Sequence, residues 1–352
     1  MSRFWSKVTN SITPYVPGEH PRDKKYIKLN TNENPYPPSL KVYEAINSEN
    51  NSNIRLYPDP DAMELKLAIS NYYKVKKEEV FVGNGSDEVL AFCFPAFFNC
   101  GEIISFPDIT YSFYPIYADL FGVKYKTVRL NNDFTIPLGA FSKDVKGIFL
   151  ANPNAPTGIA LGTSEIEAFV KSFSNTLVIV DEAYVDFSDQ SMVQFINKYD
   201  NLLVVQTFSK SRQLAGLRVG FAIGNAELIE GLEKIKNSFN SYPLDRIAQK
   251  AAVAAIEDEQ HFKETCAKII KTRDYTFDKL VELGYKVLSS KTNFLFVSHE
   301  RFSGRELFLR LRQEGILARH FPKPNIENWL RITIGTDEEM GILIEKLKGL
   351  VV

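Results

Sequence analysis

The stretches VKGIFLAN (residues 145–152), TLVIVDEAY (176–184) and NLLVVQTFSK (201–210) decide the fold. Each contains a short apolar run rich in Val, Ile and Leu, which is typical of strands buried on both faces of a sheet. Between the first two lies SEIEAFVKSF (164–173), with apolar residues at helical spacing and Ser164 as a possible cap. This alternation predicts an α/β fold with a mostly parallel sheet covered by helices, because an all-β fold would not accommodate the helices.

The rest of the chain divides into three predicted parts. Residues 1–38 are rich in Pro and Asn without sustained periodicity, so we expect an extended arm that packs on the small domain or on a partner subunit. Residues 39–247 are predicted to form the large domain. Long charged amphipathic helices, TNFLFVS (292–298) and the alternating LRITIG (330–335) predict a smaller α+β domain over residues 248–352.

Composition excludes several classes of function. The 42 basic and 43 acidic residues give no charge bias toward nucleic acid or an anionic membrane. No run of 18 apolar residues occurs, and the N-terminus lacks the apolar core of a signal peptide, so we expect a cytoplasmic location. The three cysteines lack CxxC spacing and the four histidines are scattered, so neither a disulfide framework nor a metal site is predicted. Cys93, in LAFCFPAFF, is expected to be a buried, inert thiol.

Polar residues follow each predicted strand. In open α/β sheets, ligands bind outside the carboxyl ends of the strands, so these residues are expected at one edge. NPNAPTG (152–158) could be a simple turn. Asp181 and Glu182 could bind magnesium in a nucleotide hydrolase, but the required phosphate loop is missing because the sequence has no Gly-Lys dipeptide. The residues gathered by this rule are Asn152, Asn154, Asp181, Tyr184, Thr207, Ser209 and Lys210.

The segment VFVGNGSDEVLAF (80–92) adds a candidate phosphate cradle. Gly83 and Gly85 follow a short apolar run, and a helix then begins whose free N–H groups favour an anion. Ser86 could be only a helix cap. A strand-end lysine, a carboxylate on the next strand, hydroxyls, an arginine and this cradle together describe a site for pyridoxal phosphate, in which the lysine forms a Schiff base and the carboxylate partners the ring nitrogen.

Eight motifs in this order carry a family resemblance: NTNENPYPPS, RLYPDPD, GNGSDEVL, TYSFYP, NPNAPTG, DEAY, TFSKSRQLAGLRVG and LRITIGT. Over nearly its whole length the chain resembles the histidinol-phosphate aminotransferase family, which belongs to the fold-type I pyridoxal phosphate enzymes. Two departures are Pro38, where Gly is expected, and Thr207, where Ser is equally usual; neither alters the catalytic set.

The resemblance implies specific roles around the cofactor. Lys210 would hold it as a Schiff base and then move a proton, while Asp181 would keep the ring nitrogen protonated. Tyr184 and Asn154 would bind the ring's phenolic oxygen, and Tyr111 would stack on the ring. The phosphate would be held by Gly85 and the backbone around Ser86 and Asp87, by Thr207, Ser209 and Arg218, and by Tyr57 of the other subunit of a homodimer.

The same resemblance implies a substrate. Arg331 would bind the α-carboxylate of glutamate in one half-reaction and the phosphate of histidinol phosphate in the other, although a surface strand arginine is also common. Arg319 would assist, and Tyr15 of the arm would help close a substrate site to which Tyr57 and Asn154 also contribute. The expected reaction is transamination of L-histidinol phosphate with 2-oxoglutarate in histidine biosynthesis. The alternatives are an aromatic aminotransferase, a threonine-phosphate decarboxylase and a DNA-binding regulator, although the last would need a basic stripe that the sequence lacks.

Overall fold

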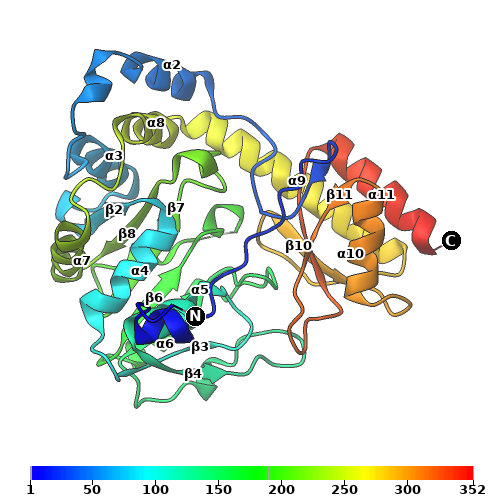
Figure 1. The fold of residues 1–352 in the computed structure, drawn as a ribbon, viewed down its shortest axis with the longest axis horizontal. Helices are drawn as coiled ribbons and strands as arrows, with labels where there is room; N and C mark the ends of the chain where they lie inside the picture. The colour runs from blue at the N-terminus through cyan, green and yellow to red at the C-terminus, as the bar shows by residue number, and fades with distance from the viewer. Residues whose placement is uncertain (1, 189, 352) are drawn as a thin grey trace.

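The central feature of the fold is a seven-stranded sheet. The computed structural model describes residues 2–188 and 190–351. Figure 1 shows this sheet beside a smaller part that contains β10 (Phe294–Ser298) and α10 (Gly304–Gln313). The strand order is β2-β8-β7-β6-β5-β3-β4, and neighbours are parallel except where β8 pairs with β2 and β7. The predicted α/β fold is thereby confirmed. The strands are β2 (Val80–Gly83), β3 (Ile103–Pro107), β4 (Lys124–Val128), β5 (Gly147–Ala151), β6 (Leu177–Asp181), β7 (Leu202–Thr207) and β8 (Gly220–Gly224).

Helices cover both faces of this sheet. Successive residues of a strand point to opposite faces, so Ile148 packs in one core and Phe149 in the other. Both faces are therefore apolar, which explains the continuous apolar runs. Cys93 is buried in the second core, and burial raises the pKa of its thiol. The first core is covered by α2 (Leu40–Glu49), α3 (Met63–Tyr73), α6 (Thr163–Ser172) and α8 (Arg246–Glu257), and the second by α4 (Gly85–Phe97), α5 (Phe113–Phe121) and α7 (Ala226–Phe239).

Helix α6 begins one residue earlier than predicted, and Ser164 does not cap it. Gly162 is the N-cap residue, and its N–H donates to Oε2 of Glu165 at 2.8 Å. A carboxylate at the third helical position can reach back in this way and satisfy a free amide. The prediction for Ser164 is therefore wrong, because Glu165 performs the capping.

The smaller part is built on a four-stranded antiparallel sheet in the order β12-β13-β10-β9. Apolar residues such as Leu295 and Leu330 pack beneath the helices in a separate core. No helix within residues 2–188 and 190–351 is both long and apolar enough to cross a membrane. The elements are β9 (Lys286–Val287), β10 (Phe294–Ser298), β12 (Arg319–His320), β13 (Leu330–Thr333), α9 (Glu259–Glu282), α10 (Gly304–Gln313) and α11 (Asp337–Val351).

The predicted boundary after residue 247 falls inside α8. The buried side chains of α8, including Ala248 and Ile256, belong to the core beside the seven-stranded sheet. Helix α9, which follows at Glu259, packs in the core of the smaller part instead. We propose that the division between the domains lies near Asp258, where α8 ends.

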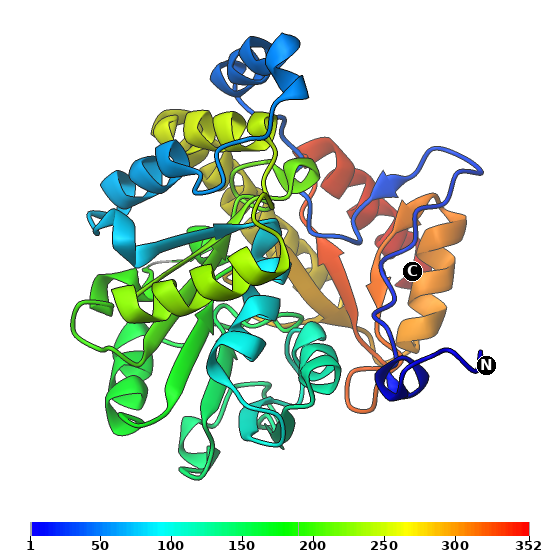
Figure 2. The ribbon, with the colours of Figure 1, turned by 60° about the vertical axis from the view of Figure 1, so that its left-hand side comes forward.

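The N-terminal arm lies along the smaller part, as Figure 2 shows for the blue segment. Its strand β1 (Ile27–Lys28) pairs in parallel with β11 (Ile316–Leu317). Arg312 forms an ion pair with Glu19 of the arm at 3.0 Å. The arm also contains α1 (Lys7–Ser11), and short 3₁₀ helices elsewhere span Ser52–Arg55, Lys77–Glu79, Leu138–Ala140, Val185–Phe187, Met192–Phe195 and Ala215–Leu217.

Candidate active site

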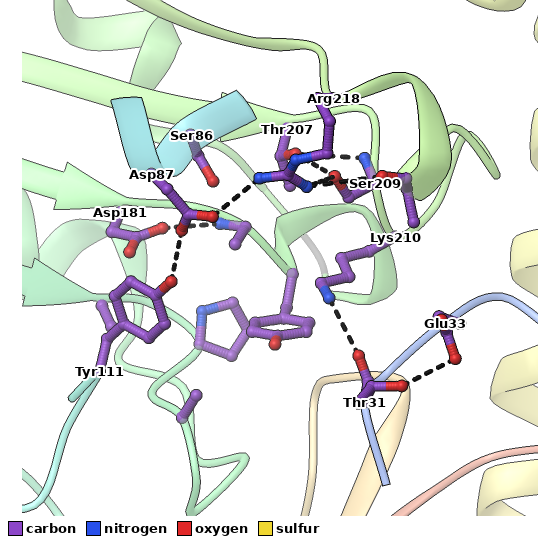
Figure 3. Close-up of a pocket in the computed structure, with 16 residues that line it drawn as sticks. Thr31, Glu33, Ser86, Asp87, Tyr111, Asp181, Thr207, Ser209, Lys210 and Arg218 are labelled. Atoms are coloured by element: carbon purple, nitrogen blue, oxygen red, sulfur yellow. Dashed lines mark hydrogen bonds and ion pairs between the residues drawn. The ribbon is translucent and has the colours of Figure 1, made fainter. Parts of the chain in front are cut away.

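A cavity of about 270 Å³ opens at the carboxyl ends of β5, β6 and β7 (Figure 3). Parallel strands end at a common edge, so residues that follow different strands meet there. Thr31 and Glu33 of the N-terminal arm also line this cavity. Predicted residues that line the cavity are Ser86, Asp87, Tyr111, Asp181, Tyr184, Thr207, Ser209, Lys210 and Arg218.

Lys210 lies in the bend that follows β7 and points its amine into the cavity (Figure 3). The Nζ atom donates to the carbonyl oxygen of Thr31 at 3.3 Å. Removal from water disfavours the charged amine and lowers the pKa of Lys210 to about 8, and the positive charge of Arg331 acts in the same direction. An amine with this pKa is partly unprotonated near neutral pH, as a nucleophile or general base must be.

Asp181 ends β6 and is buried on the floor of the cavity. The Tyr114 hydroxyl donates to Oδ2 at 2.9 Å, and the Ala183 N–H donates to Oδ1 at 3.1 Å. Burial raises the pKa of the Asp181 carboxyl to about 6, although both hydrogen bonds oppose this. Tyr114 belongs to the motif TYSFYP, but sequence reasoning chose only Tyr111 from it.

The start of α4 forms a close-fitting cradle beside β8. Gly85 has φ +81°, and a side chain there would meet the guanidinium of Arg218. At Gly220, a Cβ atom would lie 2.2 Å from the backbone nitrogen of Ser86, so only glycine fits. The cradle therefore brings free backbone N–H groups close to the cavity at a helix N-terminus, where the helix dipole favours an anion.

Hydroxyls and one guanidinium surround this cradle. The Thr207 hydroxyl donates to Oγ of Ser209 at 3.0 Å. Arg218 donates to Oδ2 of Asp87 at 2.8 Å and to Oγ of Ser209 at 3.5 Å. The Tyr111 hydroxyl donates to the other oxygen of Asp87. The side chain of Asp87 thus links Arg218 to Tyr111, a role that the sequence prediction, which used only its backbone, did not include.

Asn154 does not line this cavity, and its side-chain amide is engaged locally. Its Nδ2 donates to the Ile109 carbonyl at 3.0 Å and to Thr157 at 3.1 Å, while its Oδ1 accepts from Thr110 at 2.7 Å. The predicted contact between Asn154 and a cofactor oxygen would require one of these bonds to change. That role stays a prediction.

A second cavity, of about 260 Å³, adjoins the first and shares Tyr111 and Ala155 with it. Arg331 on β13 lines this second cavity, and its Nη2 donates to the carbonyl of Asn30 at 3.0 Å. Its Nε atom is buried and has no hydrogen-bond partner among residues 2–188 and 190–351. A half-buried guanidinium that lacks a carboxylate favours an anionic ligand.

Arg319 and Tyr15 also line the second cavity. Arg319 donates to the carbonyl of Val16 at 2.7 Å, which ties the arm to β12. The ring of Tyr15 lies 4.5 Å from that of Phe113, between centroids. The structure thus brings both residues to the cavity that Arg331 lines.

Tyr57 lies away from both cavities of its own chain. It is 78% exposed, and its ring stacks on Tyr242 at 4.6 Å between centroids. Its carbonyl accepts from Arg246 at 3.0 Å. The predicted phosphate contact of Tyr57 would therefore require a second copy of the chain, and that role stays a prediction.

The arm segment NTNEN (30–34) is the main feature that sequence reasoning missed. Besides the contacts of Asn30 and Thr31, Asn32 donates to the Tyr184 hydroxyl at 2.8 Å and Asn34 donates to the Lys210 carbonyl at 3.0 Å. The spacing of the motif follows no helix or strand period that would place its side chains. Only the tertiary structure shows that it contacts three site residues.

Comparisons with known proteins agree with this geometry. The model of the family "Aminotransferase class I and II" matches residues 24–347. The histidinol-phosphate aminotransferase of Clostridium beijerinckii is 53% identical over 99% of this chain and 97% of its own length, and that of a Marinomonas species is 54% identical over 99% and 100%.

A solved structure shows the same fold. It is histidinol-phosphate aminotransferase from Sinorhizobium meliloti in complex with pyridoxal 5'-phosphate, with a TM-score of 0.91 and 24% identity, covering 100% of this chain and 98% of that chain. The chain therefore belongs to the class I and II aminotransferases and, within them, to the histidinol-phosphate aminotransferase family.

Proposed function

We propose that this chain transfers the amino group of L-histidinol phosphate to 2-oxoglutarate, giving imidazole-acetol phosphate and L-glutamate, in histidine biosynthesis. The observation that carries the proposal is the position of Arg331, whose guanidinium has no carboxylate partner in the described residues and lines the second cavity, which adjoins the cavity of Lys210. Both substrates carry anions, and relatives that are 53% and 54% identical over 97% and 100% of their own lengths are named histidinol-phosphate aminotransferase.

The first cavity fits pyridoxal phosphate as the cofactor. The cradle at Gly85 and Gly220 excludes side chains and suits a phosphate group, with hydroxyls and Arg218 beside it. Asp181 suits the protonated nitrogen of the pyridine ring, and the amine of Lys210 suits its aldehyde. When bound, pyridoxal phosphate supplies an aldehyde that condenses with amines and a ring that accepts electrons from the carbon that loses its proton.

The protein's own groups then perform the remaining tasks. Lys210, with its lowered pKa, would remove a proton from the substrate carbon and deliver it to the former aldehyde carbon of the cofactor in the same half-reaction. In the second half-reaction it would move a proton in the opposite direction. Asp181 is buried, so its charge is poorly screened and strongly favours a protonated ring nitrogen. Arg331 and Arg319 hold the substrate anion in the second cavity, and Tyr15 limits the access of water.

We further propose that the chain acts as a homodimer with shared sites, in the cytoplasm. Exposed apolar side chains occur near Tyr57 in the sequence and the structure, among them Ile54, Leu56 and Tyr242. A cluster of exposed apolar side chains is typical of a protein interface. Burial of this cluster against a second copy would bring Tyr57 toward the partner's phosphate cradle.

The experiment is an assay of purified protein with pyridoxal phosphate, 2-oxoglutarate and one amine at a time. Histidinol phosphate should give glutamate and imidazole-acetol phosphate, with a kcat/KM well above that for phenylalanine. An aromatic aminotransferase would prefer phenylalanine, whereas a threonine-phosphate decarboxylase would release CO2 from threonine phosphate without an oxoacid. Absence of glutamate with histidinol phosphate would end the proposal.

A further inference from the structure

We propose that Asn32 is a positioning residue that directs the hydroxyl hydrogen of Tyr184 into the cavity of Lys210. The inference rests on the proposed cofactor and deepens that proposal. Asn32 lies in the arm segment NTNEN and is 152 residues from Tyr184 in sequence, yet the two side chains meet at 2.8 Å.

The chemistry of the two groups fixes the direction of this hydrogen bond. Nδ2 of Asn32 can only donate, so the Tyr184 oxygen accepts from it. The hydrogen of Tyr184 must then point elsewhere, and among the described residues the hydroxyl donates no hydrogen bond. Because Tyr184 lines the first cavity, its hydrogen is available to a ligand there.

Thr333 holds the Asn32 amide in this orientation. The Thr333 hydroxyl donates to Oδ1 of Asn32 at 3.1 Å and accepts from the Asn32 backbone N–H at 3.0 Å. Asn32 and Thr333 are both buried. Rotation of the amide by half a turn would leave the buried Thr333 hydrogen without an acceptor, which is costly. The chain of bonds therefore runs in one direction, from Thr333 through Asn32 to Tyr184.

The backbone of Asn32 is fixed as well. Its φ is +56°, a left-handed conformation that Asn tolerates better than most residues. Its carbonyl accepts from Nδ2 of Asn293 at 3.0 Å. The amide is thus held in place by two residues of the smaller part, Asn293 and Thr333.

This arrangement makes Tyr184 a stronger donor. A hydroxyl that accepts one hydrogen bond donates its own hydrogen more strongly. In the proposed complex, Tyr184 donates to the phenolic oxygen of the cofactor. Stronger donation favours the anionic form of that oxygen. The cofactor bound to Lys210 then holds the proton beside this oxygen less tightly. It therefore loses that proton at a lower pH.

Other charged side chains act on Tyr184 and Lys210, so the test must leave these charges unchanged. The distance from Nζ of Lys210 to the centroid of the Tyr184 ring is 5.9 Å. Arg331, Asp181 and Asp87 also act on Tyr184 electrostatically. The test therefore removes Asn32 without introducing a charge.

The test is the pH titration of the visible absorbance of the bound cofactor in the Asn32→Gly holoenzyme. Glycine adopts a positive φ without strain, so the substitution removes mainly the amide. We expect the titration midpoint to rise by roughly 0.5 pH unit or more, as one neutral hydrogen bond allows. Tyr184→Phe should raise it in the same direction, and adding Asn32→Gly to Tyr184→Phe should produce little further change.

The outcomes separate positioning from simple structural support. The inference would be overturned by an unchanged titration midpoint in Asn32→Gly or in Tyr184→Phe. It would also be overturned if Asn32→Gly shifted the midpoint equally in wild type and in Tyr184→Phe. If Asn32→Gly does not fold, Thr333→Val takes its place, because this substitution keeps Asn32 but removes the hydroxyl that orients its amide. An unchanged titration midpoint in Thr333→Val would also overturn the inference. Thr276→Val is the matched control, because Thr276 is a buried threonine of α9 whose hydroxyl donates to the Thr272 carbonyl. Failure of the proposed function would be distinct, because wild-type protein would then bind no cofactor or form no glutamate.

Discussion

Arg319 and Arg331 occupy facing positions on the antiparallel strands β12 and β13. The ring of Phe321 lies 5.6 Å from the guanidinium carbon of each, measured to the ring centroid. Each arginine donates to a backbone carbonyl of the arm, at Val16 and Asn30. Two like charges at facing positions repel each other, so an anion that contacts both would relieve the repulsion as well as gain hydrogen bonds.

The first prediction concerns this pair. Arg331→Gln should lower kcat/KM for both glutamate and histidinol phosphate by about 10- to 100-fold, since each hydrogen bond to a charged group contributes about 1.5–3 kcal/mol. Arg319→Gln should reduce kcat/KM for histidinol phosphate more than for glutamate. Steady-state kinetics with both substrates would check this, with Arg305→Gln on α10 as a control for loss of an arginine. Equal losses in Arg319→Gln for the two substrates would contradict a phosphate role.

The second prediction concerns the covalent bond to the cofactor. Lys210→Ala should still bind pyridoxal phosphate through the cradle and Asp181, yet borohydride should no longer fix the cofactor to the protein. Mass spectrometry of reduced and denatured protein gives the readout, and wild-type protein should carry the label on Lys210. A label that persists on another lysine of the variant would show that the reactive amine was assigned wrongly.

The carboxyl ends of the strands were predictable, whereas the arm contacts were not. Asp181 and Lys210 follow short Val-, Ile- and Leu-rich runs that are typical of buried strands, and parallel strands must end at one edge. Thr31 contacts Lys210 across 179 residues of sequence, and no periodicity in NTNEN indicates this. The apolar stripe of α8 is equally uninformative, because an amphipathic helix has the same pattern whichever core receives it.

The third prediction concerns pH and Asp181. Its folded-state pKa of about 6 exceeds the ordinary value of 3.8, so the folded state binds this proton more tightly than the unfolded state. Its stabilising contribution is therefore present below about pH 4 and is lost as pH rises through about 6. In cofactor-free protein at pH 8, Asp181→Asn should raise the free energy of unfolding by up to about 3 kcal/mol.

Urea unfolding of both proteins between pH 4 and 8 would measure this effect. The difference in unfolding free energy between Asp181→Asn and wild type should grow with pH between about 4 and 6 and then level off. The variant should at the same time lose nearly all transaminase activity, because it cannot favour a protonated ring nitrogen. A difference that does not change with pH would show that burial does not raise the pKa of Asp181.

The fourth prediction concerns the fit of the cradle. Gly220→Ala places a methyl group 2.2 Å from the backbone nitrogen of Ser86, so the first turn of α4 must move. Cofactor affinity should fall about tenfold or more, because overpacking of this kind typically costs about 1–3 kcal/mol. Titration of cofactor-free protein with pyridoxal phosphate gives the affinity. The matched control is Gly216→Ala, where a Cβ meets nothing within 4 Å, and an equal loss there would argue against a specific cradle.

The fifth prediction tests whether Tyr57 acts across subunits. Tyr57 is exposed and lies away from the cavities of its own chain, so its proposed phosphate contact requires a second copy. Tyr57→Ala and Lys210→Ala dimers should each have low activity. When the two are mixed and allowed to exchange subunits, half of the dimers become mixed, and each mixed dimer has one site with both Lys210 and the partner's Tyr57. Activity should therefore rise to about a quarter of the wild-type value. If Tyr57 served its own chain, no site in a mixed dimer would contain both groups, and mixing would restore nothing.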